Sequence, residues 1–225
     1  MDKLAVPSLK ALVELLLSNQ TYSRCILLVR HGESQGNTSW DMHGSTEYEL
    51  TARGVSQAKE IGDALDPFVD HIKKVKTSTM IRSIQTCHHV MNIDIRHEWK
   101  GEIIYDYRLR EINLGAMEGT YVDLANIAQA DYSAVWHCVM ANHIKPPGSE
   151  GGLGFNRRVK ESLREAVDGL NVYFAHSGVI YTMAMDTTGR HFVGNCGAIG
   201  LGYDNKKDLF ELIGVYNGHN GSKDS

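Results

Sequence analysis

Two short apolar runs, each followed within two residues by a histidine, constrain this chain more than any other feature of its sequence. Residues 25–29 lead into Arg30 and His31, and residues 172–175 lead directly into His176. A short, continuous apolar run is typical of a β-strand that is buried on both faces. In α/β proteins, ligands bind beyond the carboxyl ends of such strands. Both histidines are therefore predicted to lie at the ligand-binding edge of a buried sheet.

Amphipathic helices are predicted between the strands. Apolar side chains recur at three- and four-residue intervals after Thr51, which is a good N-cap, and again in residues 155–167 and 179–185. A further helical stretch is expected over about residues 121–142. Another helix is expected to follow a cap on Ser78 or Thr79, with Ile81, Ile84, Cys87 and Met91 on its buried face.

Further strands complete the pattern. They are predicted near residues 74–78 and 103–105, and residues 198–203 and 209–215 are expected to pair as a hairpin. Strands that alternate with helices favour an α/β layer fold with a largely parallel sheet. Because a length of 225 residues suits one large core, residues 1–225 are expected to form a single domain.

The two ends of the chain are expected to differ. Residues 1–22 are predicted to form a helical extension that packs on the domain, whereas residues 218–225 are expected to be a flexible polar tail. A signal peptide is the minority alternative for the leucine-rich start, because Lys10 and Glu14 interrupt the apolar stretch. No apolar run approaches the ~20 residues of a membrane span, so no membrane contact is expected. One stripe of the helix holds Leu9, Leu12, Val13, Leu16 and Leu17.

Charge and cysteine usage narrow the classes of function. The chain has 23 Lys and Arg against 27 Asp and Glu, a net charge of −4. This balance argues against a nucleic-acid binder, which needs a basic face, but not against a small anionic ligand. The cysteines lack the paired spacing of a zinc site or a disulfide framework, which favours a reducing, cytoplasmic location. They are Cys25, Cys87, Cys138 and Cys196.

The histidines also indicate a kind of chemistry. A lone histidine is more often structural than catalytic, but here two occupy corresponding strand ends, and Arg30 directly precedes His31. Arginine binds phosphate oxygens in a planar, bidentate way, and neutral imidazole is a nucleophile at neutral pH. The pair therefore favours a phosphoryl-transfer site.

Five motifs occur in an order that resembles the histidine phosphatase superfamily, also called the phosphoglycerate mutase-like family. The resemblance extends from about residue 26 to residue 215. It implies a three-layer α/β/α sandwich with a central, mostly parallel sheet. The matching segments are residues 28–34 with Asn37, residues 50–54, residues 77–82, residues 109–112 with Glu118, and residues 176–178.

The resemblance also implies roles for individual residues. His31 is expected to attack phosphorus and become a phosphohistidine, while Arg30, Arg82 and His176 hold the phosphoryl oxygens. Positioning and charge stabilisation dominate phosphoryl transfer, and arginines here take the place of a metal ion. Neither a metal nor a cofactor is therefore expected.

A carboxyl group is expected to handle the protons. The resemblance assigns Glu111 as the general acid and base, although local sequence alone does not separate it from the neighbouring acids. Substrate contacts are expected from Asn37, Ser34 and Ser177, while Asn37 also suits a turn and Ser34 a helix cap. The neighbouring acids are Glu102, Asp106 and Glu118.

Two further groups of residues are candidates for substrate choice. One comprises Lys100, Arg108 and Arg110, which would either read a second anionic group on the substrate or be solvated surface charges. The second is the loosely matching segment 39–48, with Trp40, His43, Ser45 and Thr46.

The leading hypothesis is a metal-independent phosphomonoesterase that acts on a small phosphorylated metabolite. The main rival is a phosphoglycerate mutase-type phosphoryl transfer, but such mutases carry a long insertion before the proline loop, and only about thirty residues separate Gly119 from Pro146 here. A protein phosphatase or a non-catalytic phosphate-binding module would also fit the same motifs.

Overall fold

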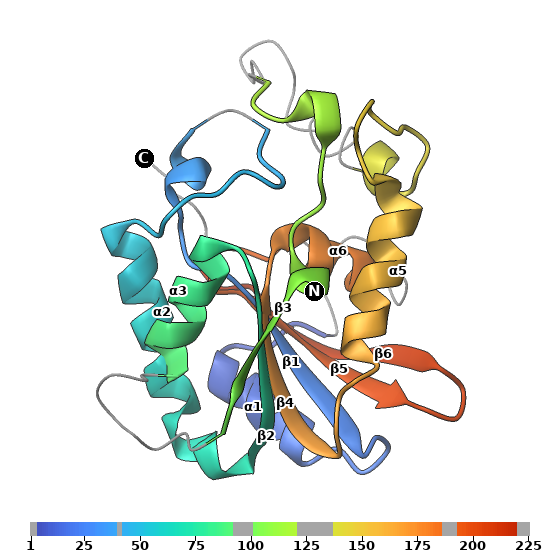
Figure 1. Cartoon of the computed structure of the whole chain (residues 1–225). Helices are drawn as coiled ribbons and strands as arrows, with labels where there is room; N and C mark the ends of the chain where they lie inside the picture. Colours follow the sequence, from blue (N-terminus) through green and yellow to red (C-terminus); the bar gives the residue numbers. More distant parts are fainter. Residues whose placement is uncertain (1–3, 40–41, 92–100, 121–136, 186–192, 220–225) are drawn as a thin grey trace.

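A six-stranded sheet, in the order β3-β2-β4-β1-β5-β6, forms the centre of the computed structural model (Figure 1). The structure describes residues 4–39, 42–91, 101–120, 137–185 and 193–219. Strands β1 to β4 pair in parallel, while β5 is antiparallel to both β1 and β6. The predicted parallel sheet and C-terminal hairpin are thus confirmed. The strands are β1 (Arg24–Arg30), β2 (Ile72–Ser78), β3 (Ile103–Asp106), β4 (Gly169–Ala175), β5 (Ala198–Asp204) and β6 (Leu209–Tyr216).

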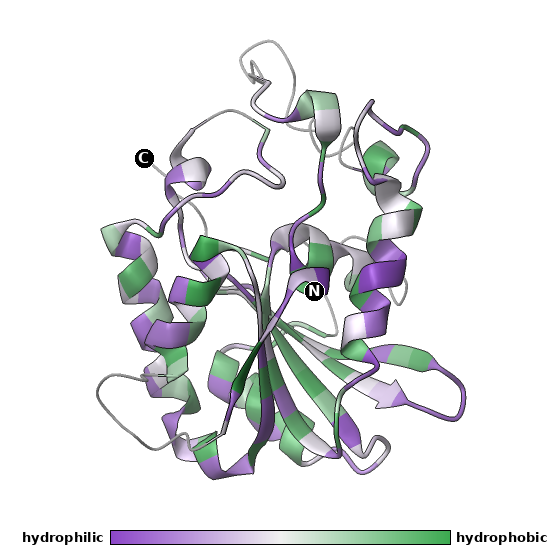
Figure 2. Ribbon diagram, in the orientation of Figure 1, coloured by the Kyte–Doolittle hydropathy of each residue, from purple (hydrophilic) through white to green (hydrophobic). Residues whose placement is uncertain are grey.

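Helices cover both faces of this sheet. Two apolar clusters, one on each face, hold alternate residues of β1: Leu27 lies in one, and Ile26 and Leu28 lie in the other. Figure 2 shows that the central strands β1 and β4 are predominantly hydrophobic, whereas the flanking helices carry both hydrophilic and hydrophobic residues. The three-layer α/β/α sandwich is therefore confirmed. Helices α1 (Leu9–Leu17), α2 (Ala52–Leu65) and α3 (Ile81–Met91) pack on one face, and α5 (Gly151–Leu163) and α6 (Ser177–Met185) on the other.

Helix α1 is packed against the C-terminal hairpin. Its N-cap is Ser8, whose hydroxyl accepts a hydrogen bond from the N–H of Ala11. Most of the predicted stripe is buried, but Leu17 remains 38% exposed. Leu12 and Leu16 lie so close to Gly200 that a side chain there would displace them.

The C-terminal tail is described only in part. His219 donates its N–H to the carbonyl of Asn195, so the first residues of the expected tail are attached to the domain. Residues 220–225 lie outside the described residues.

Helix α3 forms where expected, and Cys87 and Met91 of the predicted face are buried, but its first turn buries other residues. Ile81 is 40% exposed, and Ile84 is only partly buried. The prediction from apolar periodicity fails near the start of α3 because polar side chains occupy the inner face there. Hydrogen bonds compensate for the burial of these side chains. Thr86, for example, accepts the N–H of Gly32. The buried residues are Arg82, Ser83, Thr86, Cys87, Val90 and Met91.

The remaining helices agree in part with their predictions. Thr51 caps α2 by accepting the N–H of Gly54. Helix α5 ends at Leu163, so Val167, expected within it, lies in the turn before β4. Of the stretch expected over residues 121–142, residues 121–136 lie outside the described residues, and residues 137–140 are helical. No helix in the described ranges is long and apolar enough to cross a membrane.

Candidate active site

The register of two neighbouring parallel strands brings His31 and His176 together. Arg30, the last residue of β1, pairs with Ala175, the last residue of β4, so the histidines that follow stand side by side. Their ring centroids are 5.3 Å apart, with an angle of 57° between the ring planes. This spacing is close to the separation of adjacent strands. The two predicted site histidines therefore share the carboxyl edge of the sheet.

The surroundings of His31 define its tautomer and its charge. Its Nδ1 lies 2.7 Å from the carbonyl oxygen of Gly32. A carbonyl only accepts hydrogen bonds, so Nδ1 carries the hydrogen and Nε2 keeps a lone pair. Burial, together with the charges of Arg82 and Arg30, holds the pKa of His31 well below its ordinary value. The ring is neutral at pH 7, with Nε2 as a potential nucleophile.

Arg82, near the start of α3, is the cation in contact with this nitrogen. Its Nε–H points at Nε2 of His31 across 3.3 Å, and its two terminal nitrogens donate to the carbonyls of Thr46 and Gly44. A guanidinium carries five N–H groups, so two remain that are not committed to any described residue. Arg82 is thus fixed in orientation while keeping donors for an anion.

Arg30 contributes a second positive charge at the end of β1. One of its terminal nitrogens donates to the carbonyl of Val193 across 2.8 Å, which anchors the side chain beside the sheet. Its charge is among the causes that depress the pKa of His31. The site therefore combines a neutral nucleophile with cations, an arrangement that suits a phosphate ester.

His176 is completely buried and is held by a serine that was expected only to cap a helix. Its Nε2 lies 2.8 Å from the hydroxyl of Ser78, the last residue of β2. Its Nδ1 has no hydrogen-bond partner among the described residues. Burial and then the charge of Arg82 hold the pKa of His176 well below its ordinary value. The position of Ser78 at the end of a strand could have revealed it as a site residue, because β2 ends at the same edge.

Glu111 reaches this edge from the segment that follows β3. Its carboxyl oxygens accept the N–H groups of Ile112 and Gly178, both at 2.9 Å, and the hydroxyl of Ser177 at 3.3 Å. A side chain at Gly178 would place its Cβ 2.1 Å from Oε1 of Glu111. Glycine is therefore required where α6 begins. Of the expected site residues, Ser177 directs its hydroxyl to Glu111, a contact the sequence did not predict.

Asn37 and Ser34 are tied to each other. The side-chain oxygen of Asn37 accepts both the N–H and the hydroxyl of Ser34, at 3.0 and 3.2 Å, and also the amide of Asn195 at 3.1 Å. Ser34 is thereby committed to the short turn at residues 35–38, as a cap would be. The NH₂ end of the exposed Asn37 side chain makes no hydrogen bond to a described residue. Asn37 thus keeps the neutral donor expected of it.

Glu118 holds the segment of residues 44–46, which in turn anchors Arg82. Its carboxylate accepts three backbone N–H groups, those of Gly44, Ser45 and Leu114. It also accepts the hydroxyls of Ser45 and Thr46. These two hydroxyls, expected to influence substrate choice, are therefore used inside the protein.

The aromatic residues expected to influence substrate choice are described only in part. His43 contacts Ser39 and Tyr48 within its own segment. Trp40 lies outside the described residues.

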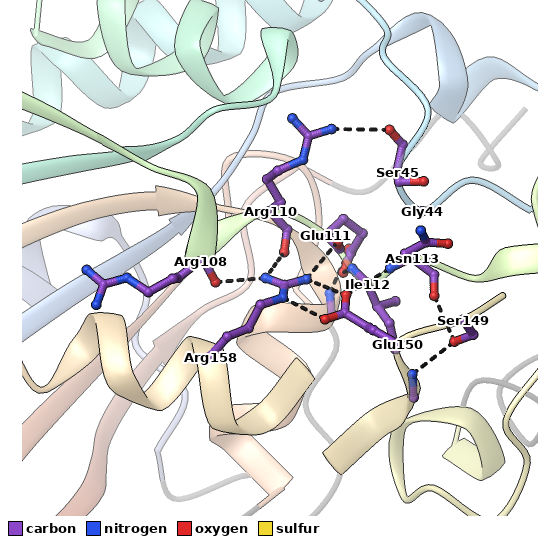
Figure 3. A network of polar contacts seen from close by, with 12 residues as sticks. Gly44, Ser45, Arg108, Arg110, Glu111, Ile112, Asn113, Ser149, Glu150 and Arg158 are labelled. Carbon is purple, nitrogen blue, oxygen red and sulfur yellow. Dashed lines mark hydrogen bonds and ion pairs between the residues drawn. The ribbon is translucent and has the colours of Figure 1, made fainter. Parts of the chain in front are cut away.

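The cations expected at the rim do not act together. Arg108 and Arg110 point in different directions, as Figure 3 shows. Arg108 pairs with Asp106 and Glu165 beside the sheet. Lys100 lies outside the described residues.

Arg110 lies nearer the site and donates to Thr79 and Glu47. Of the three expected cations, it is therefore the one that the described structure places beside Arg82. Burial lowers the pKa of Arg82, and the charge of Arg110 lowers it further. Within the described ranges, no group of three His, Cys, Asp or Glu side chains is arranged to hold a metal ion.

Known proteins share parts of this sequence and its fold. The chain is 26% identical over 138 residues to the 2,3-bisphosphoglycerate-dependent phosphoglycerate mutase of Rhizobium etli, which covers 60% of this chain and 63% of that protein. It is 34% identical over 94 residues to the enzyme of the same name from Corynebacterium diphtheriae, covering 42% and 37%. The matches thus span less than two thirds of these relatives.

A solved structure matches over nearly the whole chain. It is a mycobacterial glucosyl-3-phosphoglycerate phosphatase in complex with VO₃, with a TM-score of 0.69 and 20% identity, covering 87% of this chain and 100% of that one. At this identity the likeness establishes the fold. The family model of the histidine phosphatase superfamily (branch 1) matches residues 26–207, a span that contains every site residue described above. The chain belongs to the histidine phosphatase superfamily.

Proposed function

We propose that this protein is a metal-independent phosphomonoesterase that acts on a small phosphorylated metabolite. The observation that carries the proposal is the state of His31, a buried neutral imidazole whose Nδ1–H is bound to the Gly32 carbonyl. The lone pair of Nε2 is thereby available to phosphorus, next to a guanidinium that keeps donors for phosphoryl oxygens.

In the first step, the lone pair of His31 Nε2 forms a bond to phosphorus while the bond from phosphorus to the leaving oxygen breaks. The electron pair of the broken bond passes to that oxygen, which takes a proton from Glu111. The cations Arg30 and Arg82 stabilise the charge on the remaining phosphoryl oxygens. His176 and Asn37 add neutral contacts. The Gly32 carbonyl stabilises the Nδ1–H of the phosphorylated, positively charged ring.

In the second step, water attacks phosphorus and the bond from Nε2 to phosphorus breaks. Its electron pair returns to the ring of His31, and Glu111, now ionised, accepts a proton from the water. Inorganic phosphate leaves, and both residues regain their starting protonation states.

Mutase activity is the second candidate, because the relatives from Rhizobium etli and Corynebacterium diphtheriae are named phosphoglycerate mutases. In a mutase, a hydroxyl of the substrate replaces the water in the second step. Against it stands the short connection, about thirty residues, between Gly119 and Pro146. The phosphatase is therefore the first choice.

The proposal is tested by the hydrolysis of an aryl phosphate with and without a chelator. We expect turnover to persist in the chelator and to be lost in His31→Ala. A ³²P label should appear on wild-type protein as an acid-labile, alkali-stable adduct. His71→Ala, a change at an exposed histidine, is the matched control and should retain both turnover and label. Undiminished turnover in His31→Ala, or loss on chelation, would contradict the mechanism.

A panel of substrates separates the remaining possibilities. Sugar phosphates, phosphoglycerates and phosphopeptides are assayed with and without 2,3-bisphosphoglycerate. Release of inorganic phosphate from small esters supports the phosphatase. Isomerisation of phosphoglycerate that depends on the bisphosphate would establish the mutase instead, and a strong preference for phosphopeptides would establish a protein phosphatase. Binding of phosphate without any turnover would indicate a non-catalytic module.

A further inference from the structure

Glu111 lies in a segment that regular secondary structure does little to fix. Between the end of β3 at Asp106 and the short turn at Gly115–Met117, the chain forms only one 3₁₀ turn, Tyr107–Leu109. Backbone hydrogen bonds of a helix or strand therefore do not hold the acid in place. Helix α5 supplies the contacts that hold the backbone of this acid.

Arg158 of α5 binds the backbone carbonyls of this acid and of residues before it. One terminal nitrogen donates to the carbonyls of Arg108 and Arg110, both at 2.7 Å, and the other donates to the carbonyl of Glu111 itself at 3.1 Å (Figure 3). A single guanidinium thus donates hydrogen bonds to three carbonyls of one irregular segment. Such charge-assisted hydrogen bonds are stronger than neutral ones.

Glu150, one residue before α5 begins, completes the arrangement. Its carboxylate binds Nε and a terminal nitrogen of Arg158, at 2.7 and 2.6 Å, in a bidentate pair. It also accepts the N–H of Asn113 at 3.0 Å. Nearby, the hydroxyl of Ser149 donates to the carbonyl of Asn113. The pair therefore holds the segment both before and after Glu111.

The donors of Arg158 are all committed within the protein. A guanidinium carries five N–H groups, and Arg158 directs one to each of two Glu150 oxygens and three to the backbone carbonyls. Its side chain is only 18% exposed and lies over the ring of Phe155. It has no donor left for a substrate. Its chemistry suits positioning rather than substrate binding.

We propose that the Arg158–Glu150 pair positions Glu111 for proton transfer to the leaving group. The proposal rests on the proposed function, because it needs Glu111 to act as the acid. The carboxyl group itself is held from α6 by Gly178 and Ser177, and Arg158 fixes the backbone from which it projects. A displacement of about 1 Å in a catalytic group costs on the order of a hundredfold in rate.

The test compares two substrates that differ in their need for an acid. An alkyl phosphate has a poor leaving group that must be protonated, whereas 2,4-dinitrophenyl phosphate has a good one that need not be. For Arg158→Gln we expect kcat/KM to fall roughly tenfold to a hundredfold with the alkyl ester and less than about threefold with the dinitrophenyl ester. Arg158→Lys should fall in between, since an ammonium cannot reproduce the planar fork.

Matched variants separate positioning from stability. Arg157→Gln changes the exposed neighbour on the same helix and should leave both substrates unaffected. Glu150→Gln should show the same leaving-group dependence as Arg158→Gln in weaker form, and it keeps the test available if Arg158→Gln does not fold. In a protein that already carries Glu111→Gln, adding Arg158→Gln should not lower kcat/KM for the alkyl ester any further.

The outcomes for the two proposals are distinct. One outcome is that Arg158→Gln and Glu150→Gln lower kcat/KM equally for the two esters while Glu111→Gln lowers it mainly for the alkyl ester. In that case the pair is merely structural and the positioning proposal is overturned. If Glu111→Gln itself fails to discriminate, the role of Glu111 in the proposed function is wrong. If the effects of Arg158→Gln and Glu111→Gln are additive with the alkyl ester, the pair acts on something other than Glu111, which also overturns the positioning proposal.

Discussion

The Nε–H of Arg82 points at Nε2 of His31 across 3.3 Å, so the histidine of one motif and the arginine of another meet at a single nitrogen. This distance is at the long end for a hydrogen bond, so the contact is weak and a phosphoryl oxygen can replace it as the acceptor. The Nε2 lone pair thus points at the Arg82 guanidinium, beside which the phosphoryl group would bind in the proposed function. In the proposed function, Arg82 would orient the nucleophile before it binds the phosphate.

Replacing Arg82 with lysine tests this double role. A lysine cannot donate in one plane to His31 and to the carbonyls of Gly44 and Thr46, as the guanidinium does. We expect Arg82→Lys to lower kcat by about a hundredfold or more, the usual effect of losing a donor to transition-state charge. Steady-state kinetics with an aryl phosphate measure it.

The surface pair of Arg164 and Asp208 provides the control for this substitution. Arg164→Lys makes the same chemical change far from any predicted site residue and should leave kcat unchanged. Wild-type kcat in Arg82→Lys would contradict the role of Arg82.

Glu118→Gln tests the support behind Arg82. Burial alone would raise the pKa of Glu118, but the N–H groups of Ser45, Gly44 and Leu114 outweigh it and hold the pKa below its ordinary value. Glutamine replaces an acceptor with a donor facing those groups. We expect a loss of about 1–3 kcal/mol in the free energy of unfolding, measured by urea denaturation, together with a raised KM.

The exposed Glu49 provides the comparison for this second substitution. Glu49→Gln should change neither the urea midpoint nor KM. If Glu118→Gln were as stable and as active as Glu49→Gln, the segment at residues 44–46 would not depend on the carboxylate.

A pair of glycines tests how closely α6 approaches Glu111. In Gly178→Ala the new Cβ would stand 2.1 Å from Oε1 of Glu111, so the carboxyl group must move. We expect at least about a tenfold loss of kcat/KM with an alkyl phosphate. Gly154→Ala, in α5, meets no atom within 4 Å and should instead raise the free energy of unfolding by roughly 0.5–1 kcal/mol. Equal activity of the two variants would show that Glu111 tolerates displacement.

The sheet and the two histidines were predictable because burial on both faces of a strand leaves a clear apolar run. Strands β1 and β4 each end one residue before a histidine, and their parallel register brings the two histidines together. Apolar periodicity predicted the buried Cys87 and Met91 of α3 but not the inner face of its first turn. Ile81 is exposed there, while Arg82 and Thr86 are buried because they are bound to the site.

The supporting residues were harder to predict for a different reason. Arg158 and Glu118 act through backbone carbonyls and N–H groups of distant segments, and such contacts leave no pattern in the sequence around either residue. Ser177 likewise looked suited to the phosphate, and only the approach of α6 to Glu111 shows where its hydroxyl points. Local sequence thus identifies the site residues at strand ends, whereas only the tertiary structure shows which other residues hold those site residues in place.

The two buried histidines also make stability depend on pH. Both pKa values lie well below 6.5 in the folded protein, chiefly because of burial and then the charge of Arg82. In the unfolded chain each returns to about 6.5, so below that pH the unfolded state binds more protons. The stabilisation of the folded state by each neutral histidine is complete above pH 6.5 and is lost as the pH falls toward the folded pKa. Each histidine should lower the free energy of unfolding by roughly 1 kcal/mol per pH unit in this window.

Urea denaturation of His176→Asn between about pH 7.5 and 5.5 measures this contribution. The variant differs from wild type in its stability at neutral pH, but the slope below pH 6.5 reports only the lost titration. We expect the free energy of unfolding of His176→Asn to change less steeply with pH than that of wild type, because one of the two buried histidines no longer titrates. His71→Asn, at an exposed position, should follow the wild-type slope. Parallel slopes for wild type and His176→Asn would mean that His176 takes up no proton on unfolding, and hence that its pKa is not lowered in the folded site.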